Sequence, residues 1–194
     1  AKVLHSRCVE IAKKYGVELL VCSSLNRNSG TMVREKTKME KMLISGVAAD
    51  KNVAKIRVAG LGNDPESTFR LLNLLDRNNL NIDVMIQSLG KDGTKSVSFT
   101  VAKPDMLRTI DVLNDNKDLL GIKKLDYDEN VAKVSVIGAG VRSHSGVAAK
   151  MFGALANAGI NTEMVTTSEI RITALIDEAY ADQAMRAIHE TFLE

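Results

Sequence analysis

Apolar and polar positions follow one pattern twice along this chain. Residues 54–60 read Ala-Lys-Ile-Arg-Val-Ala-Gly, and residues 132–138 read Ala-Lys-Val-Ser-Val-Ile-Gly. After each of these predicted strands come a polar turn, a helical pattern, two further strands and a second helix. An internal repeat of this length indicates a duplicated structural unit. Two equivalent shallow sites, or a paired surface, are therefore expected rather than one deep catalytic cleft.

The first repeat has the element order βαββαβ, which is the ferredoxin-like arrangement of an α+β fold. Its predicted strands are 55–61, 83–89, 96–102 and 122–127. Its predicted helices are 65–78, with Phe69, Leu71, Leu72, Leu74 and Leu75 inward, and a second one that carries Met106, Ile110 and Leu113.

The second repeat has the same order but only three strands of its own. They are predicted at 132–138, 163–167 and 171–176, with helices at 146–158 and around Tyr180, Ala184, Ile188 and Phe192. An uncovered sheet edge is costly, and residues 42–49 are a strand candidate without a neighbour. We therefore predict that this strand completes the second repeat, so that the first is nested inside it. Each antiparallel sheet would carry its helices on one face.

The N-terminal segment does not belong to either repeat. A helical stripe over residues 2–15 ends at Gly16, which can supply a left-handed cap, and residues 17–22 are predicted to be a buried strand. This pair looks like the tail of a larger α/β domain, and turn-rich, charged residues 26–41 are predicted to be a linker. The predicted boundaries are therefore 1–41 for the tail and linker, 42–50 for the completing strand, 51–129 for the first unit and 130–194 for the second.

Composition narrows the class of protein. A hydrophobic content of 45% in 194 residues indicates a globular chain, whereas a net charge of +2 with 4% aromatic residues disfavours nucleic-acid binding. No run of about 18 apolar residues or signal-peptide pattern is present, so no membrane association is expected. Cys8 and Cys22 have no metal or redox spacing and are expected to be reduced, mostly buried thiols of a cytoplasmic protein.

Motifs for catalysis are weak. Gly138-Ala139-Gly140 lies between a strand and a helix, but the third position of a dinucleotide fingerprint is Ser143 and the next strand leads into a hairpin. The chain has no Gly-Lys-Ser/Thr phosphate loop, and its three histidines show no metal-ligand spacing. We expect no catalytic residue, metal or cofactor in this chain.

The two strand-to-helix turns are the better candidates for ligand contact. Asn63-Asp64-Pro65 opens one helix and Arg142-Ser143-His144 opens the other, and free backbone N–H groups at a helix start can bind a carboxylate. Asp64 and Ser143 could equally be ordinary N-caps.

Amide and hydroxyl side chains mark the strands that follow. Asn81 and Asn161 each open one of these strands, and an Asn amide can both donate to and accept from a zwitterion. They could equally be turn residues. Gln87 and the run 166–169 lie at the far ends, facing either a partner or solvent.

At these residues the chain resembles the C-terminal regulatory region of aspartate kinase, with its two ACT repeats. The matching segments are 133–138, 142–147, 158–161 and 167–172, and residues 1–24 resemble the last helix and strand of the kinase domain. The resemblance implies feedback regulation by lysine or threonine, effectors held between ACT units paired side by side in a homodimer, and a nested second unit. The kinase motifs are absent, so the chain alone should be inactive, although the parent kinase is expected to use ATP and Mg.

The resemblance also assigns two effector sites by position. One set is Asn63, Asp64, Thr68 and Gln87 with Asn161 and Thr162 from the facing unit; the other is Ser143, His144, Val147, Thr167 and Ser168 with Asn81 and Asp83. Glu66 stands where the family turn usually has Gly, so the first site is expected to be the weaker, and Thr162 replaces an apolar residue. Two rival functions stay open: a ligand-free dimerisation module and a complete small phosphotransferase.

Overall fold

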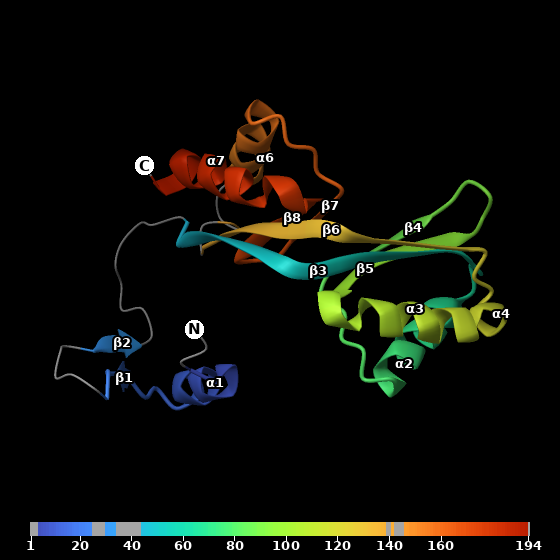
Figure 1. Cartoon of the computed structure of the whole chain (residues 1–194), viewed down its shortest axis with the longest axis horizontal. Coiled ribbons are helices and arrows are strands. Elements are labelled where there is room, and N and C mark those ends of the chain that lie inside the picture. Colours follow the sequence, from blue (N-terminus) through green and yellow to red (C-terminus); the bar gives the residue numbers. More distant parts are fainter. Residues whose placement is uncertain (1–3, 25–29, 34–43, 139–140, 142–145, 194) are drawn as a thin grey trace. The chain divides into compact units, whose positions relative to one another are not determined.

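A computed structural model describes residues 4–24, 30–33, 44–138, 141 and 146–193. The chain divides into two compact parts, Ala1–Met42 and Leu43–Glu194. Figure 1 labels the elements of both parts.

The N-terminal part consists of one helix and a two-stranded sheet. Helix α1 (Ser6–Lys14) begins at His5, whose side chain accepts a hydrogen bond from the backbone N–H of Arg7 at 3.3 Å. Strands β1 (Leu19–Val21) and β2 (Thr31–Val33) pair antiparallel.

Two predictions for this part were wrong. Residues 31–33, expected in a linker, form β2, because their extended backbone is stabilised by pairing with β1; the rest of that linker, 34–41, lies outside the described residues. The strand over 17–22 is not buried: the side chain of Leu20 is 59% exposed, and both cysteines are exposed. A sheet of two short strands offers too little surface to cover them.

The C-terminal part is built on one six-stranded antiparallel sheet of order β4-β5-β3-β6-β8-β7. The strands are β3 (Gly46–Leu61), β4 (Met85–Leu89), β5 (Lys95–Ala102), β6 (Lys124–Ile137), β7 (Met164–Thr167) and β8 (Arg171–Asp177). The α-helices are α2 (Pro65–Arg77), α3 (Met106–Asp115), α4 (Lys117–Leu120), α6 (Val147–Asn157) and α7 (Ala181–Leu193), with 3₁₀ turns η1 (Lys103–Asp105) and η2 (Glu178–Tyr180).

Two long central strands join the repeats. Residues 46–50 of β3 pair with 133–137 of β6. Residues 53–61 of β3 pair with β5, and residues 53–59 also pair with 124–131 of β6. The second repeat thereby receives its fourth strand from the segment before the first repeat, as its missing strand predicted. The predicted strands 42–49 and 55–61 are one continuous strand, however, and so are 122–127 and 132–138; residues 42–43 are not described.

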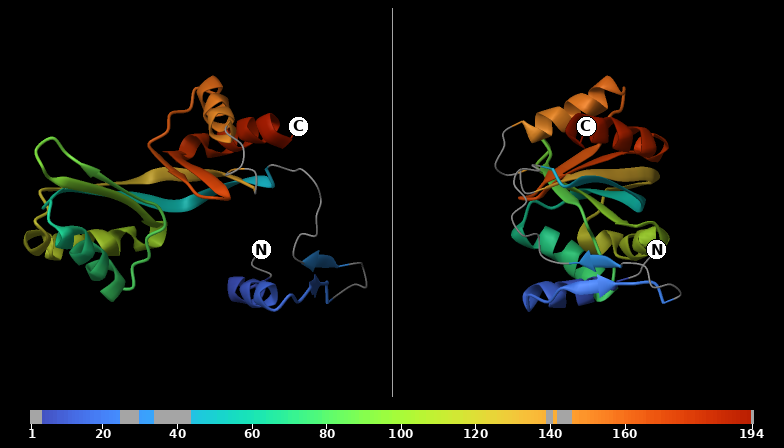
Figure 2. Two further views of the ribbon diagram at one scale, coloured as in Figure 1. Left: turned by 180° about the vertical axis from the view of Figure 1, so that it is seen from behind. Right: turned by 90° about the vertical axis from the view of Figure 1, so that its left-hand side faces the viewer.

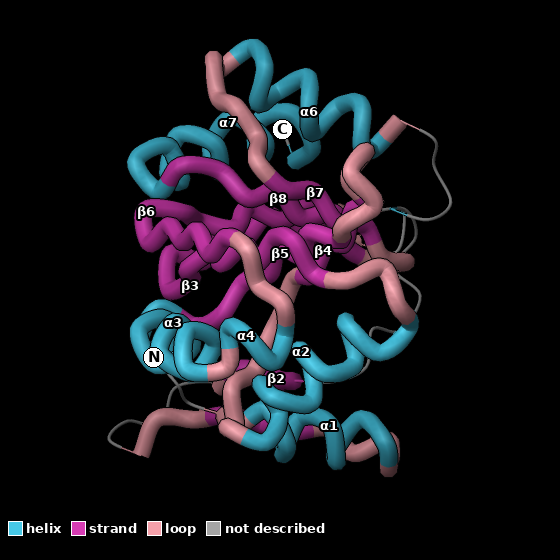
Figure 3. The backbone as a smooth tube through the Cα atoms, turned by 90° about the vertical axis from the view of Figure 1, so that its right-hand side faces the viewer, coloured by secondary structure: helices cyan, strands magenta, loops and turns pink. Residues whose placement is uncertain are grey.

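The helices of the two repeats cover opposite faces of this sheet. Figure 2 and Figure 3 show α6 and α7 on one face and α2, α3 and α4 on the other. Alternate side chains of a strand point to opposite faces of the sheet. Ile56 and Val58 of β3 point to the face with α2 and α3, and Val134 and Val136 of β6 point to the face with α6 and α7. Each repeat thus has its helices on one face, and the two sheets merge into one.

One residue predicted to point inward does not. Phe69 on α2 is 64% exposed, because the buried stripe of that helix runs through Leu71 and Leu75. Tyr180, predicted in the last helix, lies in η2, just before α7.

The junction between the repeats has its own small core and ion pairs. Val53, Val131, Met164 and Leu175 form a buried cluster. Two lysines of the first repeat pair with acids of the second: Lys55 with Glu163, and Lys103 with Glu178 at 2.9 Å. The junction is therefore packed as well as covalently continuous.

Candidate functional site

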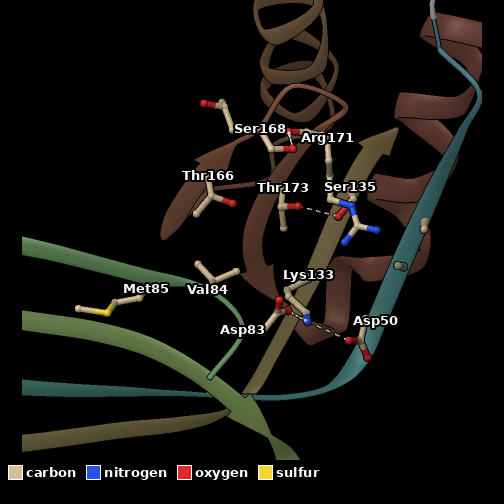
Figure 4. A pocket seen from close by; sticks show the side chains of 13 residues that line it. Asp50, Asp83, Val84, Met85, Lys133, Ser135, Thr166, Ser168, Arg171 and Thr173 are labelled. Carbon is tan, nitrogen blue, oxygen red and sulfur yellow. Dashed lines mark hydrogen bonds and ion pairs between the residues drawn. The ribbon is translucent and has the colours of Figure 1, made fainter. Parts of the chain in front are cut away.

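A cavity of about 500 Å³ lies between the repeats. Its walls come from the beginning of β3, from β6, β7 and β8 of the second repeat, and from residues 83–85 at the start of β4 in the first repeat. Figure 4 shows the side chains that line it. Both repeats contribute lining residues. The pairing register of β3 with β6 therefore determines which side chains face the cavity.

One lysine between two carboxylates is its most prominent feature. Lys133 on β6 lies 3.0 Å from Asp50 on β3 and also binds the carboxylate of Asp83 (Figure 4). The lysine side chain is 15% exposed, whereas Asp50 and Asp83 are 49% and 59% exposed. The buried lysine is thus paired with two carboxylates, and both carboxylates remain in contact with solvent.

Ionisation of this cluster follows from its contacts. Burial alone would lower the pKa of Lys133, but hydrogen bonds to Asp83 and Asp50 outweigh it and hold that pKa above its ordinary value. Partial burial would raise the pKa of Asp50, but its bonds with Lys133 and with the N–H of Asn52 hold it below its ordinary value. Both shifts favour the charged forms of Lys133 and Asp50 at neutral pH.

Hydroxyl groups form another part of the lining. Ser135 Oγ and Thr173 Oγ1 are 2.8 Å apart, and both residues are buried. Thr166, Thr167 and Ser168 follow along β7 to its turn, where the backbone N–H of Ser168 donates to the carbonyl of Arg171 at 2.7 Å. These groups offer neutral donors and acceptors to a polar ligand.

Arg171 supplies a second cation at the first residue of β8. Its side chain extends past Ser135 towards β3 in Figure 4. Within the part of the chain that the structure describes, no carboxylate forms an ion pair with it. A guanidinium binds a carboxylate through two parallel hydrogen bonds. The cavity thus combines acids for an ammonium group with a guanidinium for a carboxylate.

The second predicted set of site residues is partly brought together here. Asp83, Thr167 and Ser168 line the same cavity. Val147 is instead buried in the core of the second repeat, and Asn81 is exposed outside the cavity lining. Ser143 and His144 lie outside the described residues.

The first predicted set has a different geometry. Thr68 Oγ1 donates to Gln87 Oε1 at 2.6 Å, which joins α2 to β4. Asp64 caps α2, accepting from the N–H groups of Glu66 at 3.0 Å and Ser67 at 2.8 Å. A hydrogen bond from the Ser67 hydroxyl is the largest cause that holds the pKa of Asp64 below its ordinary value. The N-cap interpretation thus applies to Asp64.

The remaining members of the first set are exposed. Asn63 precedes the cap, and Asn161 and Thr162 lie in the turn before β7. Among the hydrogen bonds and ion pairs between described residues, none joins the turn at Asn63 to the turn at Asn161. Their assignment to a site between facing units remains a prediction.

Sequence reasoning missed Lys133, Asp50, Arg171, Ser135 and Thr173. One signal was available: Lys133 and Ser135 interrupt an otherwise apolar strand at alternate positions, so that strand has one polar face. The partners of that face depend on strand register, which local pattern does not specify.

The described residues contain neither a cluster of metal ligands nor a helix that could span a membrane. No group of three His, Cys, Asp or Glu side chains there is arranged to hold a metal ion. None of the described helices combines the length and apolar character needed to cross a membrane.

Comparison with known proteins shows first the kind of domain in this chain and then the protein family to which the chain belongs. An ACT domain model matches residues 134–192, so the second repeat is an ACT unit. The aspartokinase of Pseudomonas aeruginosa is 38% identical over 195 residues, covering 99% of this chain and 47% of that protein. The chain therefore spans about half the length of the relatives it matches.

Two crystal structures match the C-terminal fold. Aspartokinase alpha and beta subunits give a TM-score of 0.72 at 42% identity, covering 77% of this chain and 98% of that one. The ligand-free regulatory subunit of aspartate kinase from Thermus thermophilus gives 0.73 at 33% identity, covering 77% and 99%. This chain belongs to the aspartokinase family and comprises its regulatory region with tandem ACT units.

Proposed function

We propose that this regulatory region senses an amino acid, lysine or threonine, and mediates feedback inhibition of aspartate-family biosynthesis by an aspartokinase. The observation that carries the proposal is the cavity between the repeats. It places Asp83 of the first ACT unit with Thr167 and Ser168 of the second, beside Arg171. Both charged ends of an amino acid find complementary groups there.

The chemistry of binding follows from the lining. The ligand carboxylate meets the guanidinium of Arg171, and its ammonium meets the carboxylate of Asp83. Hydroxyls of Thr167 and Ser168 complete the polar contacts. Hydrogen bonds to charged groups contribute roughly 1.5–3 kcal/mol each, so removing one anchor weakens binding about ten- to hundredfold.

Regulation follows by linkage. The effector binds one arrangement of the two ACT units more tightly and biases the attached kinase towards its inhibited form. We assign residues 1–41 to the kinase-domain tail and linker, 42–50 to the completing strand, and 51–129 and 130–194 to the two units. The kinase domain is then the partner that reads out the bound state.

The proposed assembly is a homodimer through ACT units placed side by side. Strands β4 and β7 are the two ends of the six-stranded sheet, and the outer edge of an end strand is a natural place for another chain to pair. Gln87 lies on β4 and Thr167 on β7, so pairing at these edges places site residues beside the partner.

Calorimetry tests the proposal against a ligand-free dimerisation module. The whole chain is titrated with L-lysine, L-threonine and L-methionine, and at least one should bind. Arg171→Gln should weaken that binding about tenfold or more, because a charged anchor is lost. Arg186→Gln is the matched control: it removes the same charge from an exposed position on α7, outside the cavity. No binding in wild type, or equal binding in Arg171→Gln, overturns the proposal.

A further inference from the structure

The cavity already contains an ammonium group of its own. Lys133 Nζ is bonded to both Asp50 and Asp83, the two carboxylates in the lining. An incoming ligand with an ammonium group therefore meets acids that are already paired. The two lining acids and the two lining cations, Lys133 and Arg171, balance to zero charge.

We propose that Lys133 is an internal competitor for the ligand ammonium, which must displace it from Asp83 before the cavity is filled. This role rests on the proposed effector function of the cavity. Lys133 is thereby a residue that sets affinity for amine-bearing ligands, although it makes no favourable contact with them.

Strand register determines which of its two carboxylate partners Lys133 gives up. Asp50 and Lys133 are direct cross-strand partners in β3 and β6, both within the second ACT unit. Asp83, in contrast, precedes β4 of the first unit. A lysine side chain is flexible and can swing about its four-carbon stem, so Lys133 keeps Asp50 when it gives up Asp83.

The exchange has a consequence for the junction between the units. The bond from Lys133 to Asp83 connects the second unit to the first. A ligand that binds Asp83 with its ammonium and Arg171 with its carboxylate replaces this connection by one through itself. Occupancy of the cavity is thereby coupled to the contact between the ACT units.

Lys103 provides a matched control. It also forms an ion pair across the junction, with Glu178 at 2.9 Å, and both side chains are 33% exposed. Neither residue lines the cavity. Removing this lysine weakens the junction without releasing a cavity carboxylate.

The experiment is calorimetry on the whole chain and its Lys133→Met and Lys103→Met variants. L-lysine and L-threonine are the amine-bearing probes, and hexanoate is a carboxylate without an amine. Lys133→Met should bind the amino-acid probe about tenfold more tightly than wild type, as expected for one released charge-assisted bond. Lys103→Met should bind as wild type does, and hexanoate should bind no more tightly to Lys133→Met.

The other possible results of this experiment would overturn the competitor role of Lys133. If Lys133→Met binds the amino acid as tightly as wild type or more weakly, the competitor role is overturned. Binding by wild type would still support the proposed function. Equal tightening in Lys103→Met, or tightening with hexanoate, also overturns it. Absence of binding in wild type overturns both proposals, whatever Lys133→Met shows. If Lys133→Met does not fold, as judged by circular dichroism, Lys133→Gln removes the same charge with a polar side chain and must show the same tightening.

Discussion

Ser135 on β6 and Thr173 on β8 are direct cross-strand partners whose hydroxyl oxygens lie 2.8 Å apart within the sheet. Both residues are largely buried, and each hydroxyl is the other's hydrogen-bond partner. Ser135→Ala leaves Thr173 without this partner and should destabilise the fold by about 1–2 kcal/mol. Urea denaturation measures the change.

The double variant Ser135→Ala/Thr173→Val provides the sharper test. It removes both hydroxyls together and leaves no orphaned group, so its cost should fall short of the summed single costs by about 1 kcal/mol. Ser88→Ala, at an exposed position of β4, should change stability by less than about 0.5 kcal/mol. Strictly additive costs in the double variant would contradict a shared hydrogen bond.

A second prediction concerns the pH dependence that Asp50 contributes. Its folded-state pKa lies below the ordinary value of 3.8, which the unfolded chain retains. Its stabilising effect is therefore complete above pH 3.8 and is lost as pH falls through the lowered folded value. Wild type should exceed Asp50→Asn in stability by up to about 1 kcal/mol at pH 7, since the Asp50 side chain is half exposed and its ion pair is screened by solvent. The stabilities of the two proteins should converge as pH falls from 3.8 through the lowered folded-state pKa of Asp50.

Lys133 gives the matching test at the basic end. Its folded-state pKa lies above the ordinary 10.5, so its contribution is complete below pH 10.5 and is lost as pH rises through the raised value. Denaturation from pH 3 to 11 checks both limits. In a Lys133→Met background, Asp50→Asn should have a smaller effect at pH 7; an undiminished effect would show that Asp50 acts through other contacts.

Much of the fold could be predicted because repeat and periodicity are local signals. The helix predicted at 65–78 spans Pro65–Arg77, and the strand predicted at 171–176 spans Arg171–Asp177. The continuity of β3 and β6 could not be predicted. Polar residues at 50–52 and 128–130 resemble turns, and the N–H groups of Asn52 and Asn130 do bond to nearby aspartates, each at 2.9 Å. They are accommodated as register shifts within the long strands.

The site was less predictable for a physical reason. Asp83, Thr167 and Ser168 were assigned to one site by the family resemblance, and all three line the cavity. Lys133, Asp50 and Arg171 join them only through the register of β3, β6 and β8. Alternation within one strand shows which of its side chains share a face, but it does not show which residues of a distant strand lie opposite them.

A third prediction concerns the start of α2. Asp64 caps this helix through the N–H groups of Glu66 and Ser67. Asp64→Ala removes the acceptor and should lower Tm by about 2–4 °C. Asp64→Asn keeps a side-chain oxygen and should lower it less. Differential scanning calorimetry compares the variants, and equal losses in both would show that charge rather than capping is responsible.

A fourth prediction tests how the second ACT unit is completed. Deleting residues 1–50 removes the β3 segment that pairs with 133–137 of β6, together with Ile44, which is buried in that unit's core. Backbone amides of 133–137 should then exchange faster, while 97–101 of β5 keep most of their protection, because their partners in β3 and β4 remain. Deleting only residues 1–42 retains Ile44 and β3 and should leave both segments protected. Hydrogen exchange by mass spectrometry reads both segments at once, and a greater loss at 97–101 than at 133–137 would contradict the nested arrangement.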